Sequence, residues 1–305
     1  EKPVDVTSQV YGPGCTNSVT KSWLAAFPTS GSILQKRDGT LVVAMLGRNA
    51  QDQKVVHLAL SKDGGKTWYA AKGNGTTNPD ESKVVEKNNG DLILSVRASG
   101  ENYKNITSDD GETWKLPAQT RYTGVKNAYC NGDFKLLTST LDGNDKNRML
   151  HTNCFANSRM NVSAVISYDE GNTWSSPKTI CPRSSAYSAL TILPDGTIGC
   201  YYEEGGLEGG YIMRYVRFSV DWLTGGEDDI TSYYPVGYKG VAINNPMIED
   251  NSFCVTSENG IISVTGATDY TITSLLGVNI PKGIGLNKGI YVVTANGKSV
   301  KTIVR

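Results

Sequence analysis

A repeated eight-residue pattern constrains this chain more than any other feature. The segments "SKDGGKTW" (61–68), "TSDDGETW" (107–114) and "SYDEGNTW" (167–174) all fit Ser/Thr-x-Asp-x-Gly-x-Thr-Trp. In such a segment the aspartate accepts backbone N–H bonds within a tight turn, and the glycine supplies the backbone freedom that the turn needs. The tryptophan can then bury its ring against the next strand. Three copies predict a fold that is built from a repeated β unit.

The segments around the repeats read as strand, turn and strand. Examples are "SGSILQKRDGTLVVAML" (30–46), "SKVVEKNNGDLILSVR" (82–97) and "SALTILPDGTIGCYY" (188–202). No amphipathic helix of useful length interrupts them. The repeats are 46 and 60 residues apart, which suits one four-stranded blade of a β-propeller each. We therefore predict an all-β fold.

Composition narrows the classes of function. The chain has 305 residues, and 30 basic and 30 acidic residues give no net field that would attract nucleic acid or anionic lipid. The sequence contains no run of 18 apolar residues, so it predicts no membrane-spanning helix. Six cysteines form no CxxC pair and there are only two histidines, so we expect no zinc site and no cofactor. One or two disulfides or buried free thiols both fit the cysteines.

The repeated pattern is similar to the Asp box of sialidases, which are six-bladed β-propellers. The resemblance covers about residues 1–224 and implies blades of such a propeller. Two boxes continue as Trp-x-x-Pro, and the chain opens with "EKPVDVT", so residue 1 is expected to follow a further box. The N-terminal blade or blades would then be missing. Because a propeller closes by pairing its first and last blades, the missing segment is expected to be a partner of this chain.

Two stretches resemble the segments that carry charged site residues in sialidases. The stretch "PDESKVVEKNNGDLILSVR" (79–97) places Glu81 one hairpin before Arg97. The stretch "NSRMNVSAVISYDEGNTW" (157–174) places Arg159 just before an Asp box. Taken singly, each residue is typical of a solvated charge or a turn acid. Their order around the boxes favours a site.

A third stretch resembles the segment that carries the nucleophilic tyrosine of the family. In "SSAYSALTILPDGTIGCYYEEG" (184–205), Tyr187 is followed by Glu203, and the adjacent Glu204 is the alternative match. A tyrosine in a strand is ordinary by itself. Its place after the two arginine segments, in the order of the family, favours a catalytic role.

The resemblance implies a retaining exo-α-sialidase that releases terminal sialic acid from glycans and glycoproteins. Arg97 and Arg159 would bind the carboxylate of sialic acid. Since this carboxylate would repel a carboxylate nucleophile, the family uses a phenol, here Tyr187, whose proton Glu81 would take. Glu203 would orient the first arginine of a triad. That arginine and the acid/base aspartate of the family have no match here, so the chain alone is not expected to be a competent enzyme.

The C-terminal part has a different character. The stretch "VRFSVDWLTGG" (216–226) reads as the last propeller strand, residues 225–243 as a polar linker, and residues 244–305 as a small β domain. The segment 288–301 resembles the final hairpin of the sorting domain of proteins exported by the bacterial type IX secretion route. This resemblance implies a secreted protein or one attached to the bacterial cell surface. A β-sandwich for sugar binding or spacing is the alternative.

Two other functions fit the propeller. A catalytically silent Asp-box propeller would bind glycans or proteins, but it would not need a tyrosine paired with a glutamate, such as Tyr187 and Glu81. A trans-sialidase would transfer the sugar to an acceptor, and transfer and hydrolysis both stay open. Calcium is not expected at the Asp boxes, because their carboxylates are used within the turns.

Overall fold

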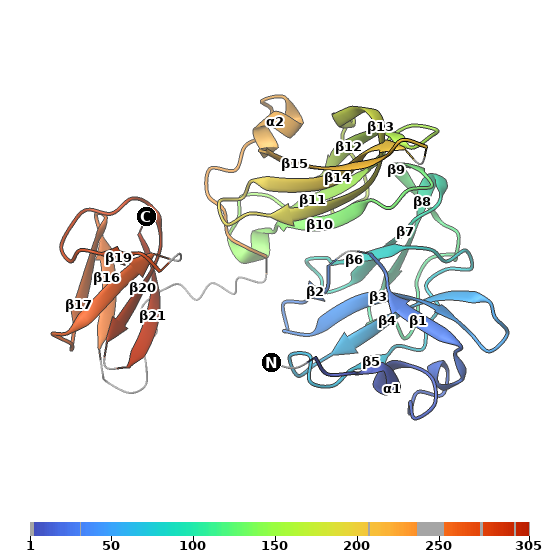
Figure 1. Ribbon diagram of the computed structural model, residues 1–305, viewed down its shortest axis with the longest axis horizontal. Coiled ribbons are helices and arrows are strands. Elements are labelled where there is room, and N and C mark those ends of the chain that lie inside the picture. The colour runs from blue at the N-terminus through green and yellow to red at the C-terminus, as the bar shows by residue number, and fades with distance from the viewer. Residues whose placement is uncertain are drawn as a thin grey trace. The chain divides into compact units, whose positions relative to one another are not determined.

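The computed structural model describes residues 3–30, 32–206, 208–236, 253–274, 277–295 and 297–304. The chain divides into two compact units, Glu1–Tyr238 and Lys239–Arg305, which we call the propeller unit and the C-terminal unit. Both consist mainly of β-strands, and the helices that the structure describes are short (Figure 1). The predicted all-β class is therefore confirmed.

Two antiparallel sheets form the N-terminal half of the propeller unit. The first contains β1 (Ala25–Pro28), β2 (Leu34–Gln35), β3 (Leu41–Arg48), β4 (Lys54–Ser61) and β5 (Tyr69–Ala70). The second contains β6 (Ser82–Glu86), β7 (Leu92–Val96), β8 (Ser99–Thr107) and β9 (Arg121–Ala128), paired in chain order. Such an order, in which sequential strands are neighbours, is that of a propeller blade.

A six-stranded sheet follows in the same unit (Figure 1). It contains, in chain order, β10 (Asp133–Thr138), β11 (Arg148–Cys154), β12 (Met160–Ser167), β13 (Lys178–Ile192), β14 (Ile198–Gly206) and β15 (Gly210–Phe218). The long strand β13 pairs with β12 through its first part and with β14 through its second. Its register shifts between Ser185 and Ser188. The strand thus passes from one blade to the next, and the shift falls at Tyr187.

The Asp boxes form the predicted turns. In the first, the Asp63 carboxylate accepts hydrogen bonds from the Thr67 backbone N–H at 2.9 Å and from the Thr67 hydroxyl at 2.6 Å. Gly65 has a φ of 91°, which side chains other than glycine rarely adopt. The same two contacts recur in the other boxes, between Asp109 and Thr113 and between Asp169 and Thr173. Local hydrogen bonds therefore fix each of these hairpins.

The burial of the strands explains why the sheets pack. Strands β6 and β7 are buried along their whole length, and β6 buries the polar residues Ser82, Lys83 and Glu86 as well as its two valines. One apolar cluster, which includes Leu58 and Leu94, joins the first two sheets. Another, which includes Leu150 and Ile198, lies within the six-stranded sheet. Removing such side chains from water is the main favourable contribution to folding.

The described helices are short: α1 (Thr7–Val10), η1 (Thr20–Ser22), η2 (Thr140–Asp142) and α2 (Val220–Thr224). The last corrects the prediction that "VRFSVDWLTGG" is one strand. Strand β15 ends at Phe218, because Ser219 caps the helix by accepting the Trp222 N–H at 3.1 Å. Gly225 ends the helix in the left-handed conformation, with a φ of 71°.

Residues 225–236, which belong to the stretch that the sequence predicts as a polar linker, pack against the rest of the propeller unit. Asp228 is only 8% exposed, and its carboxylate accepts hydrogen bonds from Arg148 Nε at 2.7 Å and from Tyr168 Oη at 2.9 Å. Arg148 itself is fully buried. Such a buried charge pair requires the two segments to stay together. The rest of the predicted linker, residues 237–243, lies outside the described residues.

Among its described residues, the C-terminal unit has two small sheets. A hairpin is formed by β16 (Cys254–Glu258) and β17 (Ile261–Thr265), and the other sheet has the order β19-β18-β20-β21. The strands of this second sheet are β18 (Tyr270–Ser274), β19 (Asn279–Ile280), β20 (Gly289–Ala295) and β21 (Lys298–Val304). Phe253, Ile272 and Val293 belong to the apolar core of the C-terminal unit. Strands β20 and β21 form the predicted final hairpin.

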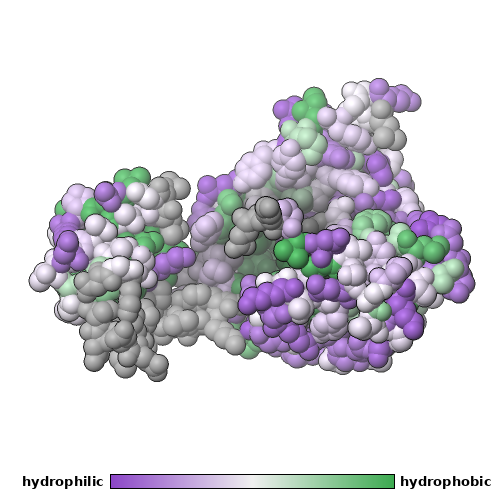
Figure 2. Space-filling model, turned by 60° about the horizontal axis from the view of Figure 1, so that its bottom comes forward, coloured by the Kyte–Doolittle hydropathy of each residue, from purple (hydrophilic) through white to green (hydrophobic). Residues whose placement is uncertain are grey.

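Apolar groups of the propeller unit lie mainly in its interior. The cysteines whose side chains the structure describes are buried free thiols: Cys15, Cys130, Cys154, Cys181 and Cys200. The face of the molecule in Figure 2 is largely polar, and its apolar residues form small separate groups. Among the described residues, no helix has the length and apolar character needed to cross a membrane.

Candidate active site

The predicted site residues lie at the ends of neighbouring strands. Glu81 comes directly before β6 and Arg97 directly after β7, and these two strands pair with each other. The Arg97 backbone N–H donates to the Glu81 carbonyl at 2.9 Å. Because opposite residues of an antiparallel pair point to the same face, both side chains leave the sheet at the same place. Tyr187 reaches this place from β13.

Arg97 connects Tyr187 and Glu81. Its Nη1 donates a hydrogen bond to Tyr187 Oη at 2.8 Å and another to Glu81 Oε2. Hydrogen bonds from a charged guanidinium are stronger than those between neutral groups. The phenol and the carboxylate therefore share one nitrogen, which holds them next to each other.

The surroundings keep Tyr187 protonated in the resting state. Burial and the Glu81 carboxylate raise the pKa of the Tyr187 phenol above its ordinary value of about 10, while Arg97 acts in the opposite direction. A neutral phenol is a weak nucleophile, so it must lose its proton when it reacts. Glu81 is the carboxylate that contacts the same guanidinium nitrogen as the phenol.

Arg159, which comes directly before β12, also reaches Tyr187. Its Cζ lies 5.4 Å from the centroid of the Tyr187 ring, and the Cζ of Arg97 lies 5.9 Å from the same centroid. The structure thus brings together Glu81, Arg97, Arg159 and Tyr187, from four separate segments. Two guanidinium groups beside one phenol can bind a single anionic group between them.

Glu203 holds the backbone of Tyr187. Its Oε2 accepts the Tyr187 N–H at 3.1 Å, from strand β14 to strand β13. A shift of register leaves backbone groups without partners in the strand ladder. The Tyr187 N–H lies at such a shift, and the Glu203 side chain supplies its hydrogen-bond acceptor. Glu204 instead forms ion pairs with Arg183 at 2.7 Å and Arg214 at 2.9 Å. Of the two adjacent glutamates, Glu203 is therefore the one that contacts the site.

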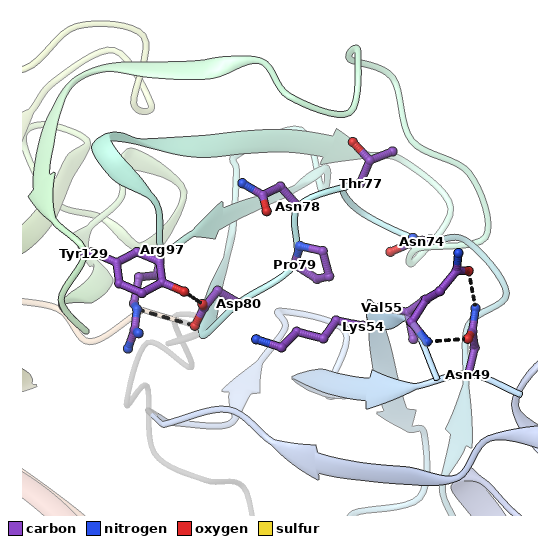
Figure 3. A pocket seen from close by; sticks show the side chains of 11 residues that line it. Asn49, Lys54, Val55, Asn74, Thr77, Asn78, Pro79, Asp80, Arg97 and Tyr129 are labelled. Carbon is purple, nitrogen blue, oxygen red and sulfur yellow. Dashed lines mark hydrogen bonds and ion pairs between the residues drawn. The ribbon is translucent and has the colours of Figure 1, made fainter. Parts of the chain in front are cut away.

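Two further residues of the site, Asp80 and Tyr129, carry no clear signal in the sequence. Asp80 Oδ1 lies 3.4 Å from Arg97 Nε, and Asp80 Oδ2 accepts the Tyr129 hydroxyl at 2.6 Å. The Tyr129 ring centroid lies 4.2 Å from Arg97 Cζ (Figure 3). The sequence alone suggests a turn acid for Asp80. For Tyr129, which lies between β9 and β10, it suggests nothing.

These carboxylates keep Arg97 charged. Burial lowers the pKa of its guanidinium, but the Glu81 and Asp80 carboxylates outweigh this effect and raise it. Nη1 of Arg97 donates both hydrogen bonds, whereas Nε lies within ion-pair distance of Asp80 and forms no hydrogen bond. In the part of the chain that the structure describes, Nη2 forms no hydrogen bond, which leaves that nitrogen for a ligand.

A cavity of about 540 Å³ opens beside Arg97 (Figure 3). Its lining is mainly polar and includes Asn49, Lys54, Asn74, Thr77, Asn78, Asp80 and Tyr129. Of the clustered residues, Arg97, Asp80 and Tyr129 line this cavity, whereas Glu81, Arg159 and Tyr187 are not part of its lining. No group of three or more His, Cys, Asp or Glu side chains among the described residues is arranged to hold a metal ion.

Fold and site together define a β-propeller with Asp boxes and a cluster of tyrosine, glutamate and arginines. A family model described as "BNR repeat-like domain" matches residues 15–200. This match covers more than half of the chain, and the chain belongs to that family.

Its curated relatives are sialidases. The chain is 30% identical to a sialidase of Micromonospora viridifaciens over 222 residues, which cover 67% of this chain and 32% of the relative. It is 28% identical to a sialidase of Vibrio cholerae serotype O1 over 138 residues, which cover 40% of this chain and 18% of the relative. The chain thus spans a third or less of the length of these relatives.

Solved structures of sialidases share the fold. A structure named Hadza microbial sialidase Hz136 aligns with a TM-score of 0.61 and 25% identity, covering 72% of this chain and 41% of that chain. The intramolecular trans-sialidase from Ruminococcus gnavus aligns with a TM-score of 0.55 and 23% identity, covering 67% of this chain and 46% of that chain. The predicted sialidase-type propeller fold is therefore confirmed.

Proposed function

We propose that this chain carries much of the active site of a retaining exo-α-sialidase, which releases terminal sialic acid from sialylated glycans and glycoproteins. One observation carries the proposal: Arg97 Nη1 contacts both Tyr187 Oη and the Glu81 carboxylate. A second guanidinium, that of Arg159, lies at the same phenol ring. A module that only binds glycans has no need for a phenol coupled in this way to a carboxylate.

Each residue has a role in this reaction. Arg97 and Arg159 bind the carboxylate of sialic acid. Glu81 takes the phenolic proton while Tyr187 Oη attacks the anomeric carbon, and the glycosidic C–O bond breaks. The leaving oxygen receives a proton from a general acid. Water then attacks the anomeric carbon from the side opposite to Tyr187 and gives its proton to the conjugate base of the general acid. The bond to the phenol breaks, the phenol regains its proton from Glu81, and sialic acid leaves with retained configuration.

The proposed reaction also needs a general acid and the first arginine of the triad, which have no match in this chain. We infer that an aspartate and an arginine in a further N-terminal propeller segment supply them, and that this segment is the partner of the chain. The length of the matched relatives supports the inference, since this chain covers 32% of the Micromonospora enzyme. The chain on its own is then expected to bind sialic acid weakly and to hydrolyse sialosides slowly or not at all.

The decisive experiment replaces Tyr187 by Phe in the full-length protein that contains this chain. The variant is expected to lose turnover of an aryl α-sialoside and to keep its thermal unfolding midpoint. Tyr201→Phe is the matched control, because Tyr201 is 48% exposed on β14 and lies outside the site. Near-normal activity of Tyr187→Phe would exclude Tyr187 as the nucleophile. Chromatography of the products separates hydrolysis from transfer to an acceptor sugar.

We also propose that the C-terminal unit directs export by the type IX route, to the medium or to the cell surface. The antiparallel β20–β21 hairpin near the end of the described chain supports this. A reporter protein fused to residues 239–305 is expected to leave a host that has the type IX route and to stay inside a strain that lacks it. Equal retention in both strains would contradict the proposal.

A further inference from the structure

Tyr129 connects both arginines of the site, although it belongs to no strand. Its ring lies against the Arg97 guanidinium, with 4.2 Å between the ring centroid and Cζ. Its carbonyl accepts a hydrogen bond from Arg159 Nη2 at 3.4 Å. Its hydroxyl donates to Asp80 Oδ2 at 2.6 Å. One residue thus contacts both arginines with different atoms and also the acid that pairs with Arg97.

The backbone of Tyr129 is strained. Its φ is 55°, in the left-handed region that a bulky side chain rarely adopts. Asn127 holds the following residue in place, because its side chain accepts the Cys130 N–H at 2.7 Å and donates to the Cys130 carbonyl at 2.9 Å. Such strain persists only where the surroundings determine the conformation, and it is found mainly at functional sites.

The same loop is attached to the strand of the nucleophile. The carbonyl of Asn131 accepts the backbone N–H of Ser188 at 3.1 Å, directly after Tyr187. The side chain of Asn131 accepts a hydrogen bond of 2.7 Å from the buried Lys83. The loop 129–131 therefore links the two arginines to Tyr187 through short polar contacts.

Tyr129 nevertheless remains 46% exposed, so burial does not explain why an aromatic residue stands there. Glycine or asparagine would adopt a positive φ at lower cost. What the tyrosine adds is the ring face against Arg97, a cation–π contact, and the hydroxyl on Asp80.

We propose that Tyr129 is a positioning residue of the site. Its ring fixes the plane of the Arg97 guanidinium, and its carbonyl fixes Arg159, so that both present their free N–H groups to one carboxylate. This inference rests on the proposed function for the identity of that carboxylate, which belongs to sialic acid. Tyr129 acts through the arginines and takes no part in bond making.

Kinetics in the full-length protein test the proposal. Tyr129→Leu removes the ring face and is expected to raise the KM for an aryl sialoside by about tenfold, with a smaller change in kcat. Tyr129→Phe keeps the ring and is expected to stay within about threefold of the original KM. The matched control is Tyr201→Leu, at an exposed tyrosine outside the site. Equal KM values for Tyr129→Leu and the control would overturn the proposal.

An NMR measurement separates this proposal from the proposed function. The Nε–H signal of Arg97 is expected to show the ring-current shift of the Tyr129 ring, to lose it in Tyr129→Leu and to keep it in Tyr129→Phe. An unchanged signal in Tyr129→Leu would overturn the positioning role. If the original protein releases no sialic acid, the proposed function fails, but this signal still decides whether Tyr129 orients Arg97.

Discussion

Arg97 Nη1 donates a hydrogen bond of 2.8 Å to Tyr187 Oη and a second one to the Glu81 carboxylate. These residues come from β13 and from either end of the β6–β7 hairpin, so the packing of two sheets sets their distance. The contact makes Arg97 the residue that couples the proposed nucleophile to its base.

Replacing Arg97 by Lys keeps the positive charge but removes the planar set of donors that reaches Tyr187, Glu81 and a ligand together. We expect kcat/KM for an aryl sialoside to fall by at least about 100-fold. Arg121→Lys is a suitable control, since Arg121 donates to the carbonyls of Ser99 and Glu101 outside the site. Equal activity of the two variants would contradict the role of Arg97.

Glu81→Gln is expected to change the titration of Tyr187. The Glu81 carboxylate is one of the causes that raise the pKa of the phenol, so its loss should lower that pKa while Arg97 still favours the phenolate. Ultraviolet difference spectra against Tyr187→Phe measure the phenolate directly. Turnover should fall by about 100-fold or more, because the base is lost. An unchanged phenol pKa would show that Glu81 does not act on Tyr187.

Two substitutions of Glu203 separate a hydrogen-bonding role from a charge role. Glu203 Oε2 accepts the backbone N–H of Tyr187, and the amide oxygen of Gln can do the same. We expect Glu203→Gln to keep activity within about fivefold and Glu203→Ala to lose about tenfold or more. If Gln is as damaging as Ala, Glu203 acts through its charge, as the resemblance to sialidases implies for a glutamate that orients an arginine.

The buried pair of Arg148 and Asp228 predicts a pH-dependent stability. Burial raises the pKa of Asp228, but hydrogen bonds from Arg148, Lys146 and Tyr168 outweigh it and hold the pKa well below its usual range. The pair therefore stabilises the fold above a pH of about 4, and this contribution is lost as the pH falls further. Asp228→Asn should lower the free energy of unfolding by about 3 kcal/mol at pH 7.

Denaturant unfolding of the propeller unit at several pH values checks this prediction. The difference between the original protein and Asp228→Asn should shrink as the pH falls below about 4. Asp221→Asn serves as the control, at an acid in the first turn of α2. A difference that stays constant at all pH values would show that Asp228 is not held as a carboxylate by Arg148.

The sequence predicts the features that depend on local chemistry. The Asp63 turn and its two copies can be predicted from the sequence, because the hydrogen bonds that form each turn lie within five residues. Glu81 and Arg97 are predicted by the resemblance of their segment to sialidases, and the single hairpin between them explains why they lie side by side. Tyr187 is readable by its resemblance to a family, and the structure adds what it contacts.

Features that depend on contacts between residues far apart in the chain cannot be predicted from local sequence patterns. Tyr129 matters through a positive φ and through Arg159, which is 30 residues away. The packing of residues 225–236 depends on a partner of Asp228 that lies 80 residues earlier in the chain. The helix α2 follows from one cap at Ser219, which competes with the strand pattern of the preceding residues.

Covalent trapping shows directly whether Tyr187 is the nucleophile. The full-length protein is incubated with 2,3-difluorosialic acid, digested, and its peptides are analysed by mass spectrometry. If Tyr187 is the nucleophile, we expect one sialyl adduct, on Tyr187. This adduct should be absent from Tyr187→Phe and should form more slowly in Arg97→Lys. An adduct on Glu81 or on another residue, or no adduct in a protein that turns over sialosides, would contradict this expectation.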